Sequence, residues 1–457
     1  MAALLLLFLA AAACGPGEGP EAEPEADQEP PNILLISLDT LRADRVSGAG
    51  YHRETTPFLD ALARRGTSFP EAFINTLGTT PSHTTMFSSL YQETHKVEYH
   101  HLEGQTAFDV IPGSVKLLAE VFKDAGYVTL GVHGGGRMSP RFGFDRGFDA
   151  YEAKGTLKRQ IRRLLALVEQ PREDGRPIFA LFHTYEVHAP YRPPQHHLEG
   201  FGPAPGRYEP SIENLQRFKR TARRELAPED LARFVDAYDA GIRYTDEGMI
   251  ELFARLRRSG FLDNCLVVIT ADHGEEFAEH GGLLHRVLLY EELIRVPLVL
   301  FGPDVPEGVV DRRMAMLVDI APTILAYAGI EVPPEMEGID LLAPAPPERV
   351  GPDAAIVAQA GNVRYTLRTR KWKLIRTHRP DRIRLFDLEN DPAERRNLKN
   401  KEPRVRDRML ETLEQWKRER RVLPDERRKA EMTAEELQML EALGYVYDTS
   451  EEAAGGR

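Results

Sequence analysis

The threonine-rich stretch "NTLGTTPSHTTMFSSLY" (75–91) has residue types found where a helix begins beside a nucleophile. Pro81 suits the first helical position, because its missing N–H is not needed there, and Thr79 or Thr80 suits the cap. The free N–H groups of a helix start attract anions. Taken alone, the stretch fits two interpretations: a well-capped structural helix, or a helix start whose hydroxyl attacks an anionic ester.

Two carboxylates follow apolar runs that have the composition of buried strands. Asp39 comes directly after "ILLISL", and Asp272 follows "CLVVIT" with His273 next to it. Each acid alone is equally well explained as a loop residue or a helix cap. Together, carboxylate and imidazole ligands suit a divalent cation such as Ca²⁺, Mn²⁺ or Zn²⁺. Such a cation would lower the pKa of a coordinated threonine hydroxyl, as it does for metal-bound water.

The 14 histidines are unevenly distributed along the chain. Segments that flank strand candidates hold His133, His183 with His188, and His280 with His285. A single histidine is more often a structural or surface group than a catalytic one. Three such segments, with glycines crowded around them, indicate that some of these histidines converge on one pocket.

The elements that must position these residues alternate along the chain from Pro31 onwards. Helical patterns at 57–66, at 114–126 and after Pro228 alternate with short apolar runs. The runs expected to form strands are 33–38, 128–132, 178–182, 266–270 and 297–301. This alternation predicts the α/β class, with a mostly parallel doubly wound sheet flanked by helices. Ligands bind beyond the carboxyl ends of the strands in such sheets.

The pattern changes beyond about residue 345. "VRYTLRTRKWKLIR" and "IRLFDL" alternate apolar with polar residues, which predicts a smaller antiparallel sheet. "TAEELQMLEALGYV" predicts a closing helix with Thr433 as its cap. We therefore expect a catalytic domain over residues 31–345 and a C-terminal α+β subdomain, with helices beside its sheet, over residues 346–457.

The first 30 residues indicate export. "MAALLLLFLAAAAC" is too short to span a bilayer and has the pattern of a signal peptide that ends in a lipoprotein cleavage box (residues 1–14). Residues 15–30 are mainly Gly, Pro and acid, which predicts a disordered tether. We expect a bacterial lipoprotein, periplasmic or at the cell surface, held on the membrane by a lipid on Cys14. Cys265 lies in an apolar run and is expected to be a buried thiol.

The composition is that of an ordinary globular protein. Hydrophobic residues make up 42% and charged residues 28% of the 457 residues. The net charge of -12 argues against a nucleic-acid partner. Because the chain is acidic as a whole, any site for an anionic substrate must be local.

The chain resembles the sulfatase family, within the alkaline-phosphatase-like superfamily. Seven stretches carry the resemblance, in the family's order along the chain: "NILLISLDTLRAD", "TTPSHTTMFSSLY", "GFDRGFD", "HAPYRPP", "TADHGEEFAEHG", "LYEELIRVPLVLFG" and "LFDLENDPAERRNL". The resemblance implies the family's fold, its metal site and its ester-hydrolase chemistry.

Carried over by position, the resemblance implies a site for one divalent metal ion. Asp39, Asp272 and His273 correspond to the family's metal ligands, and Thr79 corresponds to the nucleophile, which also binds the metal. The resemblance favours Ca²⁺, with Mn²⁺ and Zn²⁺ as alternatives.

Three histidines correspond to other catalytic positions of the family. His188 is similar to the anion-contacting or general-acid histidine of the H-x-P motif. His285 occupies a place where many members carry a lysine that touches the transferred group. His83 stands where an arginine usually follows the nucleophile by four residues.

The chain departs from the family at the nucleophile itself. Sulfatases proper convert Cys or Ser in C/S-x-P-x-R to formylglycine, whereas Thr79 cannot form that aldehyde. In addition, Thr40 replaces the second aspartate that often follows the first ligand. Histidines at 83 and 285 also remove two fixed positive charges, which favours singly charged esters. We therefore expect hydrolysis of phosphodiesters or phosphonate monoesters, with weaker cleavage of sulfate esters.

The expected substrate is a sulfate or phosphate ester of a small molecule, a glycan or a lipid. Two alternatives remain at the level of sequence. One is a transferase that passes the group to a lipid or glycan, and the other is an inactive, sulfatase-like binding lipoprotein. The presence of Asp39, Thr79, Asp272 and His273 argues against the inactive form.

Overall fold

The structure is a computed structural model, and its largest sheet has eight strands. The model describes residues 29–102, 105–170, 175–285, 288–351, 353–378, 380–424, 426 and 428–443. The sheet order is β14-β2-β13-β9-β1-β8-β6-β7. Its main strands are β1 (Asn32–Leu38), β6 (Val128–His133), β8 (Ile178–Thr184), β9 (Cys265–Thr270) and β13 (Leu298–Phe301).

The expected strand segments all belong to this sheet, and its mostly parallel character is confirmed. Strand β1 pairs in parallel with both β8 and β9, while β6 pairs in parallel with β8 and with β7 (Ala150–Ala153). Strand β13 runs antiparallel to β9 and to β2 (Thr67–Ser68), and β14 (Val309–Val310) forms the edge beside β2. Strands β1, β6, β8 and β9 are buried along their whole length apart from Asn32, because helices cover both faces.

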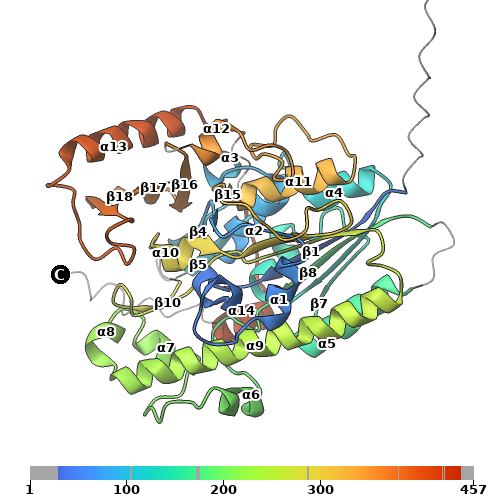
Figure 1. Cartoon of the computed structure of the whole chain (residues 1–457), viewed down its shortest axis with the longest axis horizontal. Coiled ribbons are helices and arrows are strands. Elements are labelled where there is room, and N and C mark those ends of the chain that lie inside the picture. The colour runs from blue at the N-terminus through green and yellow to red at the C-terminus, as the bar shows by residue number, and fades with distance from the viewer. Residues whose placement is uncertain are drawn as a thin grey trace, which may run out of the picture. The chain divides into compact units, whose positions relative to one another are not determined.

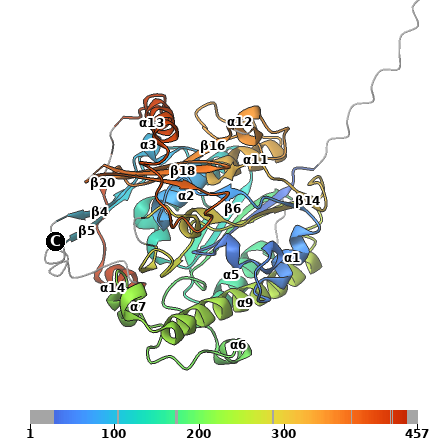
Figure 2. The ribbon, with the colours of Figure 1, turned by 60° about the vertical axis from the view of Figure 1, so that its left-hand side comes forward.

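Helices form the two outer layers (Figures 1 and 2). The layer on one face contains α1 (Pro57–Ala63), α5 (Leu157–Val168) and the long α9 (Pro228–Arg258). The layer on the other face contains α2 (Thr79–Ser88), α4 (Leu118–Asp124) and α11 (Ile320–Tyr327). The sheet is therefore doubly wound, as the alternation of strands and helices predicts.

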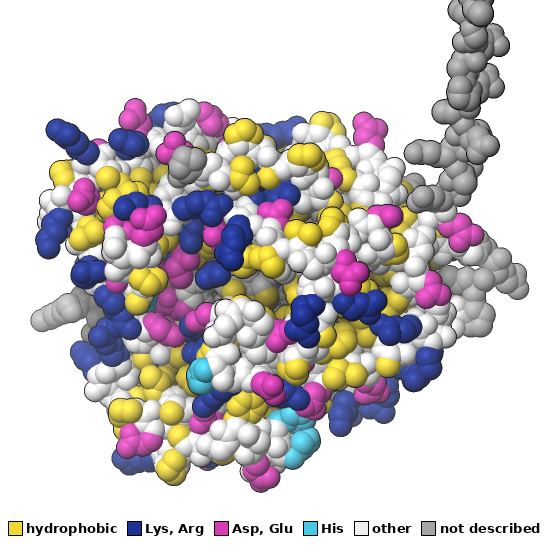
Figure 3. Space-filling model, in the orientation of Figure 1, with side chains coloured by type: hydrophobic (Ala, Val, Ile, Leu, Met, Phe, Trp, Pro, Cys, Tyr) yellow, Lys and Arg dark blue, Asp and Glu magenta, His cyan; other side chains and the backbone are white. Residues whose placement is uncertain are grey.

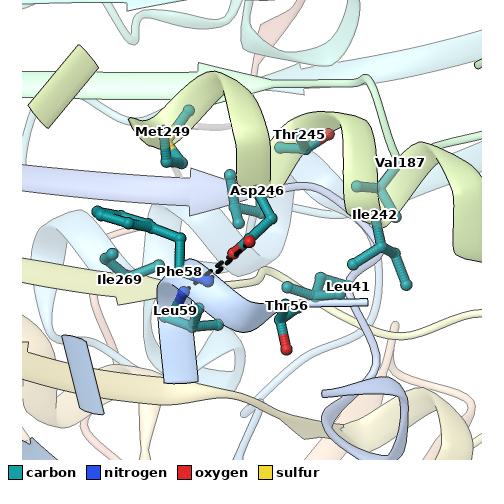
Figure 4. Close-up of a pocket in the computed structure, with 11 residues that line it drawn as sticks. Leu41, Thr56, Phe58, Leu59, Val187, Ile242, Thr245, Asp246, Met249 and Ile269 are labelled. Carbon is teal, nitrogen blue, oxygen red and sulfur yellow. Dashed lines mark hydrogen bonds between the residues drawn. The ribbon is translucent and has the colours of Figure 1, made fainter. Parts of the chain in front are cut away.

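Helix α1 begins without a side-chain cap from its own N-cap residue, Thr56. Its start is instead bound by α9, where the Asp246 carboxylate accepts hydrogen bonds from the N–H groups of Phe58 (2.8 Å) and Leu59 (2.9 Å) (Figure 4). Burial raises the pKa of Asp246 to about 6. A carboxylate suits this place because a helix N-terminus carries unpaired N–H donors.

Helix α2 differs from the sequence expectation at its start. It begins at Thr79 with Gly78 as N-cap, so Pro81 is its third residue rather than its first. Gly78 has φ = 104°, a conformation that side chains other than glycine rarely adopt. Every residue of α2 is buried, since the helix lies under other elements on all sides.

The smaller antiparallel sheet expected near the C-terminus is present. It has the order β16-β17-β18-β19, and its strands are Ala355–Ala360, Arg364–Thr369, Trp372–His378 and Asp381–Asp387. Helix α13 (Pro403–Arg418) covers one side of this sheet and buries Met409 and Leu413 there (Figure 2). Helix α14 (Ala434–Ala442) begins at Thr433, whose side chain accepts from the N–H of Glu436, as expected.

Short elements complete the described part of the chain. Strand β3 (Ala72–Phe73) joins β12 (Arg295–Val296) and β15 (Ala315–Met316), and β10 (Glu276–Phe277) pairs with β11 (Leu283–Leu284). Strands β4 (Tyr99–Leu102), β5 (Gln105–Val110) and β20 (Arg428–Lys429) form a third small sheet. The remaining helices are α3 (Gln92–His95), α6 (Gln195–Gly200), α7 (Ile212–Arg217), α8 (Ala222–Glu225), α10 (Glu291–Ile294) and α12 (Pro347–Val350).

The expected signal peptide, Cys14 and nearly all of the tether lie outside the described residues. Within the described ranges, no helix is both long enough and apolar enough to cross a bilayer. Cys265 is buried as expected, and burial raises the pKa of its thiol.

Candidate active site

The candidate site lies where the carboxyl ends of β1 and β9 meet the start of α2. Asp39 directly follows β1, Asp272 and His273 follow β9, and Thr79 is the first residue of α2. All four side chains are completely buried. The two strands are neighbours in parallel register, with Ser37 opposite Thr270, so their ends deliver both carboxylates to one place.

The ligand atoms at this place fit a cation. One donor atom each from Asp39, Asp272 and His273 lie within 4.8 Å of one another. Asp39 Oδ1, Asp272 Oδ2 and His273 Nε2 are buried and have no hydrogen-bond partner among the described residues. Buried charges and polar atoms in proteins are normally paired, hydrogen-bonded or bound to metal. Two carboxylate oxygens and an imidazole nitrogen are a donor set for a divalent cation.

The Thr79 hydroxyl lies beside these atoms. Its Oγ1 is 3.4 Å from Asp39 Oδ2, to which it donates. On the next turn of α2, Ser82 Oγ donates to the backbone oxygen of Asp272 at 2.7 Å, which ties the helix start to the end of β9. The Thr79 oxygen therefore lies at a helix N-terminus and beside a carboxylate. These are the surroundings expected for a nucleophile that attacks an anion.

Thr40 occupies the place of the family's second aspartate and has a structural function instead. Its backbone N–H donates to Asp272 Oδ1 at 3.2 Å, and its hydroxyl donates to the backbone oxygen of Asp39 at 2.7 Å. Its φ of 61° is unusual for a threonine. The residue orients the Asp272 carboxylate and binds the Asp39 backbone without adding a charge to the site.

His83 is also at the site, but both ring nitrogens have partners within the protein. Nδ1 is 2.8 Å from the backbone oxygen of Thr79, so this nitrogen carries the proton and donates. Nε2 then accepts from the hydroxyl of Ser37 at 2.9 Å. Burial lowers the pKa of His83, which keeps the ring neutral at pH 7. In this arrangement His83 supports the first turn of α2 and adds no fixed positive charge.

His183 lies in one of the histidine segments noted in the sequence, but the sequence predicted no function for it at the site. Its Nε2 lies 3.2 Å from Asp39 Oδ2, while its Nδ1 accepts from the N–H of Gly134 at 3.4 Å. Nε2 therefore carries the proton and donates to the carboxylate, so His183 orients Asp39. The signal in the sequence was its place in a histidine segment beside a strand candidate, whereas its position opposite Ser37 of β1 is not readable from sequence.

His188 and His285 lie next to each other on the other side of the site. Their ring centroids are 5.1 Å apart, and the ring of His285 is 4.5 Å from that of His273. His285 Nδ1 is 3.0 Å from Glu275 Oε1, and the other oxygen of Glu275 accepts from the hydroxyl of Tyr191 at 3.0 Å. This carboxylate holds His285 so that Nε2 faces away from Glu275.

Burial dominates the electrostatics of this histidine pair. It lowers the pKa of His188 to about 4, with a further contribution from His285. It also lowers the pKa of His285, with a contribution from His273. Both rings are therefore neutral near pH 7 without an anion beside them, and an anionic ester would favour their protonated forms.

The two remaining candidate histidines lie in different environments. His133 is buried and stacks on Tyr151 with ring centroids 4.3 Å apart, and burial lowers its pKa to about 3. His280 contacts Glu292 at 2.7 Å and stacks on Tyr290. His280 therefore belongs to a charged cluster beside the site rather than to the group around Asp39.

Arg42 connects the loops that follow β1 and β9. Its Nη1 donates to the backbone oxygen of Glu275 at 2.9 Å and to Glu279 at 2.7 Å, while its other guanidinium nitrogens bind Asp44.

On the face seen in Figure 3, acidic and basic side chains are interspersed. An anionic substrate must therefore be held by the local site rather than by the overall field of this face.

The chain is similar to a family of known proteins over most of its length. The family model described as Sulfatase matches residues 31–330. Bos taurus arylsulfatase K is 25% identical over 486 residues, which covers 88% of this chain and 86% of the relative. Bacteroides thetaiotaomicron N-acetylglucosamine-6-O-sulfatase is 31% identical over 181 residues, covering 36% and 32%.

A solved structure shows the same fold. The phosphonate monoester hydrolase of Agrobacterium radiobacter superposes with a TM-score of 0.68 at 20% identity, covering 84% of this chain and 95% of that chain. The family match includes Asp39, Thr79, Asp272 and His273 and extends over more than half of the chain. The chain belongs to the sulfatase family.

Proposed function

We propose that this sulfatase-family ester hydrolase is metal-dependent and cleaves sulfate or phosphate esters through a covalent ester on Thr79. The observation that carries the proposal is the position of the Thr79 hydroxyl. It lies at the start of α2, 3.4 Å from Asp39 and beside three buried ligand atoms that lack hydrogen-bond partners in the described chain.

Asp39, Asp272 and His273 would hold the divalent cation. When bound, the cation supplies positive charge that lowers the pKa of the Thr79 hydroxyl and offsets the charge of the ester. The family resemblance favours Ca²⁺, and the imidazole ligand is also compatible with Mn²⁺ or Zn²⁺. His183 donates to Asp39 and keeps that carboxylate in place.

In the first step, Thr79 Oγ1 attacks sulfur or phosphorus while its proton passes to Asp39 Oδ2, and the bond to the alcohol oxygen breaks. The N–H groups at the start of α2 stabilise the charge on the oxygens of the transferred group. His188 or His285 gives a proton to the departing alcohol. In the second step, water attacks the ester on Thr79 and gives a proton to the histidine that protonated the alcohol, while Asp39 returns the proton to the Thr79 oxygen. The product released is sulfate from a sulfate ester, a phosphate monoester from a phosphodiester, or a phosphonate from a phosphonate monoester.

Singly charged esters are the substrates that these side chains favour, and the preference for phosphorus over sulfur rests on Thr79, which lacks the second hydroxyl through which a formylglycine hydrate releases sulfate. His83 is neutral and directed at Ser37 and the Thr79 backbone, and His285 is also neutral near pH 7. Neither supplies a fixed positive charge that would balance a doubly charged monoester. The fold is also similar to phosphonate monoester hydrolases. We therefore expect phosphodiester or phosphonate-monoester hydrolysis, with weaker cleavage of sulfate esters.

Thr79→Ala tests this proposal. The substitution should lower kcat/KM at least about 10³-fold on whichever aryl ester the wild type cleaves fastest, because the covalent route is lost. Thr79→Ser should retain part of the activity. Thr84→Ala is the matched control, since the Thr84 hydroxyl binds only the backbone oxygen of Thr80 within α2. The panel contains one aryl sulfate, one phosphate monoester, one phosphodiester and one phosphonate monoester.

Mass spectrometry of quenched reactions provides a second readout. The peptide that contains Thr79 should carry the transferred sulfuryl or phosphoryl group, and activity should not require a coexpressed formylglycine-generating enzyme. Full activity of Thr79→Ala would refute the nucleophile. Robust sulfatase turnover without any phosphodiester or phosphonate hydrolysis would refute the substrate preference alone.

A further inference from the structure

A cavity of about 150 Å³ opens beside His188, outside the group of metal ligands. Its walls come from Gly134 just after β6, from the end of β8 and the loop that follows it, from α5 and the segment that leads into it, and from Leu443 just beyond α14. His188 lines this cavity and also contacts His285, which in turn contacts His273. The cavity is therefore connected to the candidate site through His188.

Gln160 places an unpartnered amide oxygen at this cavity. The side chain lines the cavity and is 2% exposed, although it lies among the apolar residues on the buried side of α5. Its Nε2 donates to the backbone oxygen of Lys154 at 2.7 Å, which determines the orientation of the amide. Its Oε1 has no hydrogen-bond partner among the described residues. A buried acceptor without a partner is unfavourable by about 1–3 kcal/mol, so a donor from a ligand would be stabilising there.

The other lining groups define the chemistry of that ligand. Glu186 provides a second acceptor, Arg192 provides donors, and the Tyr185 ring forms a flat wall. Closely spaced acceptors, donors and one aromatic face suit an alcohol that carries several hydroxyl groups. A quaternary ammonium group is disfavoured, because the positively charged guanidinium of Arg192 lies at the cavity. A long acyl chain is disfavoured by the charged groups.

The contact of the cavity with His188 agrees with a place for the departing alcohol, an argument that rests on the proposed function. Thr79 attacks from the side of the metal ligands, so the bond that breaks points away from them in an in-line displacement. A histidine that protonates the leaving oxygen must stand next to the departing alcohol. We infer that the cavity beside His188 holds the alcohol part of the ester, a hydroxyl-rich unit such as a single sugar residue, and that Gln160 binds one of its hydroxyl groups.

Gln160→Met tests the contact at nearly constant side-chain volume. The substrates are glucose 6-sulfate and the methyl phosphodiester of glucose 6-phosphate, each compared with the aryl ester of the same acid. The ratio of kcat/KM for the sugar ester to kcat/KM for the aryl ester should fall about 10-fold or more, mainly through KM. Gln415→Met, at an exposed position on α13, is the matched control and should leave the ratio unchanged.

Gly155→Leu tests the cavity by steric blocking rather than by loss of a polar group. Gly155 lines the cavity, and a Cβ built there meets no atom within 4 Å. Its φ does not lie in the left-handed region, so a side chain is tolerated by the backbone. The substitution should lower turnover of the sugar esters in the same way as Gln160→Met, with the melting temperature unchanged.

An unchanged ratio in both variants would overturn the inference, because the cavity would then hold only water. An equal loss on sugar and aryl esters would also overturn it. If the wild type cleaves none of these esters, the proposed function fails instead. Saturation-transfer NMR of glucose with the Thr79→Ala variant then tests separately whether the cavity binds a sugar. A signal that Gln160→Met abolishes supports the inference, whereas binding of choline in preference to glucose contradicts it.

Discussion

Replacing Asp39 by Asn tests the metal site through stability, without an assay of activity. Asp39 and Asp272 are both completely buried, and burial together with repulsion from Asp272 raises the pKa of Asp39. The contribution of this carboxyl to the free energy of unfolding is therefore present at low pH and is lost as the pH rises through its raised pKa. Near pH 7, metal-free Asp39→Asn should melt at a higher temperature than the metal-free wild type.

Addition of the metal should reverse this order. A cation that binds only the folded state adds about 2.7 kcal/mol when its free concentration is 100 times Kd. The compact unit begins at Pro31, and its described residues end at Leu443. At roughly 2.1 cal/mol/K per residue, its unfolding entropy is about 0.9 kcal/mol/K, so this stabilisation corresponds to a rise of about 3 °C in Tm. Asp39→Asn should lose most of that rise, because a charged ligand is gone.

The assay is calorimetric melting of EDTA-treated protein at pH 7.5, with Ca²⁺, Mn²⁺ or Zn²⁺ added in separate runs. Asp263→Asn removes one carboxylate at an exposed position and is the matched control, which should leave both the metal-free Tm and the metal-induced rise unchanged. A metal-free Asp39→Asn protein that melts below the wild type would refute the argument from buried charge. A metal-induced rise equal to that of the wild type would refute the assignment of Asp39 as a ligand.

Three further predictions concern other parts of the molecule. His183→Phe removes the 3.2 Å contact to Asp39 and should weaken metal binding about 10–100-fold by calorimetric titration; unaltered affinity would exclude an orienting function. Because burial raises the pKa of Asp246 to about 6, stability contributed by this group is lost as the pH rises through 6. From pH 7 to 5, the wild type should therefore gain about 1 kcal/mol relative to Asp246→Asn in urea titrations, and a parallel pH dependence of the two proteins would contradict this. We also propose lipid anchoring: the mature protein should partition into detergent and Cys14→Ser should not, whereas an N-terminus downstream of Cys14 would count against a lipoprotein.

The strands and helices near the site were largely predictable from local pattern. The apolar runs before Asp39 and Asp272 are β1 and β9, and the helix after Pro228 is α9. These elements are recognisable because a strand buried on both faces needs a continuous apolar run, and a long helix needs a periodic one. The exact start of α2 was not predictable, since the positive φ of Gly78 lets the helix begin two residues before Pro81.

The sheet order and the direction of β13 depended on pairing between distant segments. Strand β1 lies between β8 and β9. Strand β13 runs antiparallel, although it is formed by the same kind of apolar run as the parallel strands. Such pairings are chosen by the packing of whole layers, so neither periodicity nor composition contains them. The same pairing placed His183 beside Asp39, a contact that the sequence did not predict although it drew attention to the segment that holds this histidine.

The sequence by itself determined which chemical groups the chain carries: acids that follow apolar runs, a threonine at a helix start and histidines in glycine-rich segments. Tertiary structure decided which of them meet. Thr79 and Asp39 are 40 residues apart in sequence, and Thr40 and Asp272 are 232 apart, yet each pair is in contact. The tertiary structure also directs the His83 ring at Ser37 and the Thr79 backbone and places His188 beside a polar cavity. The physical reason is that side-chain type is a local property, whereas distance, burial and the resulting pKa are set by segments brought together only in the folded chain.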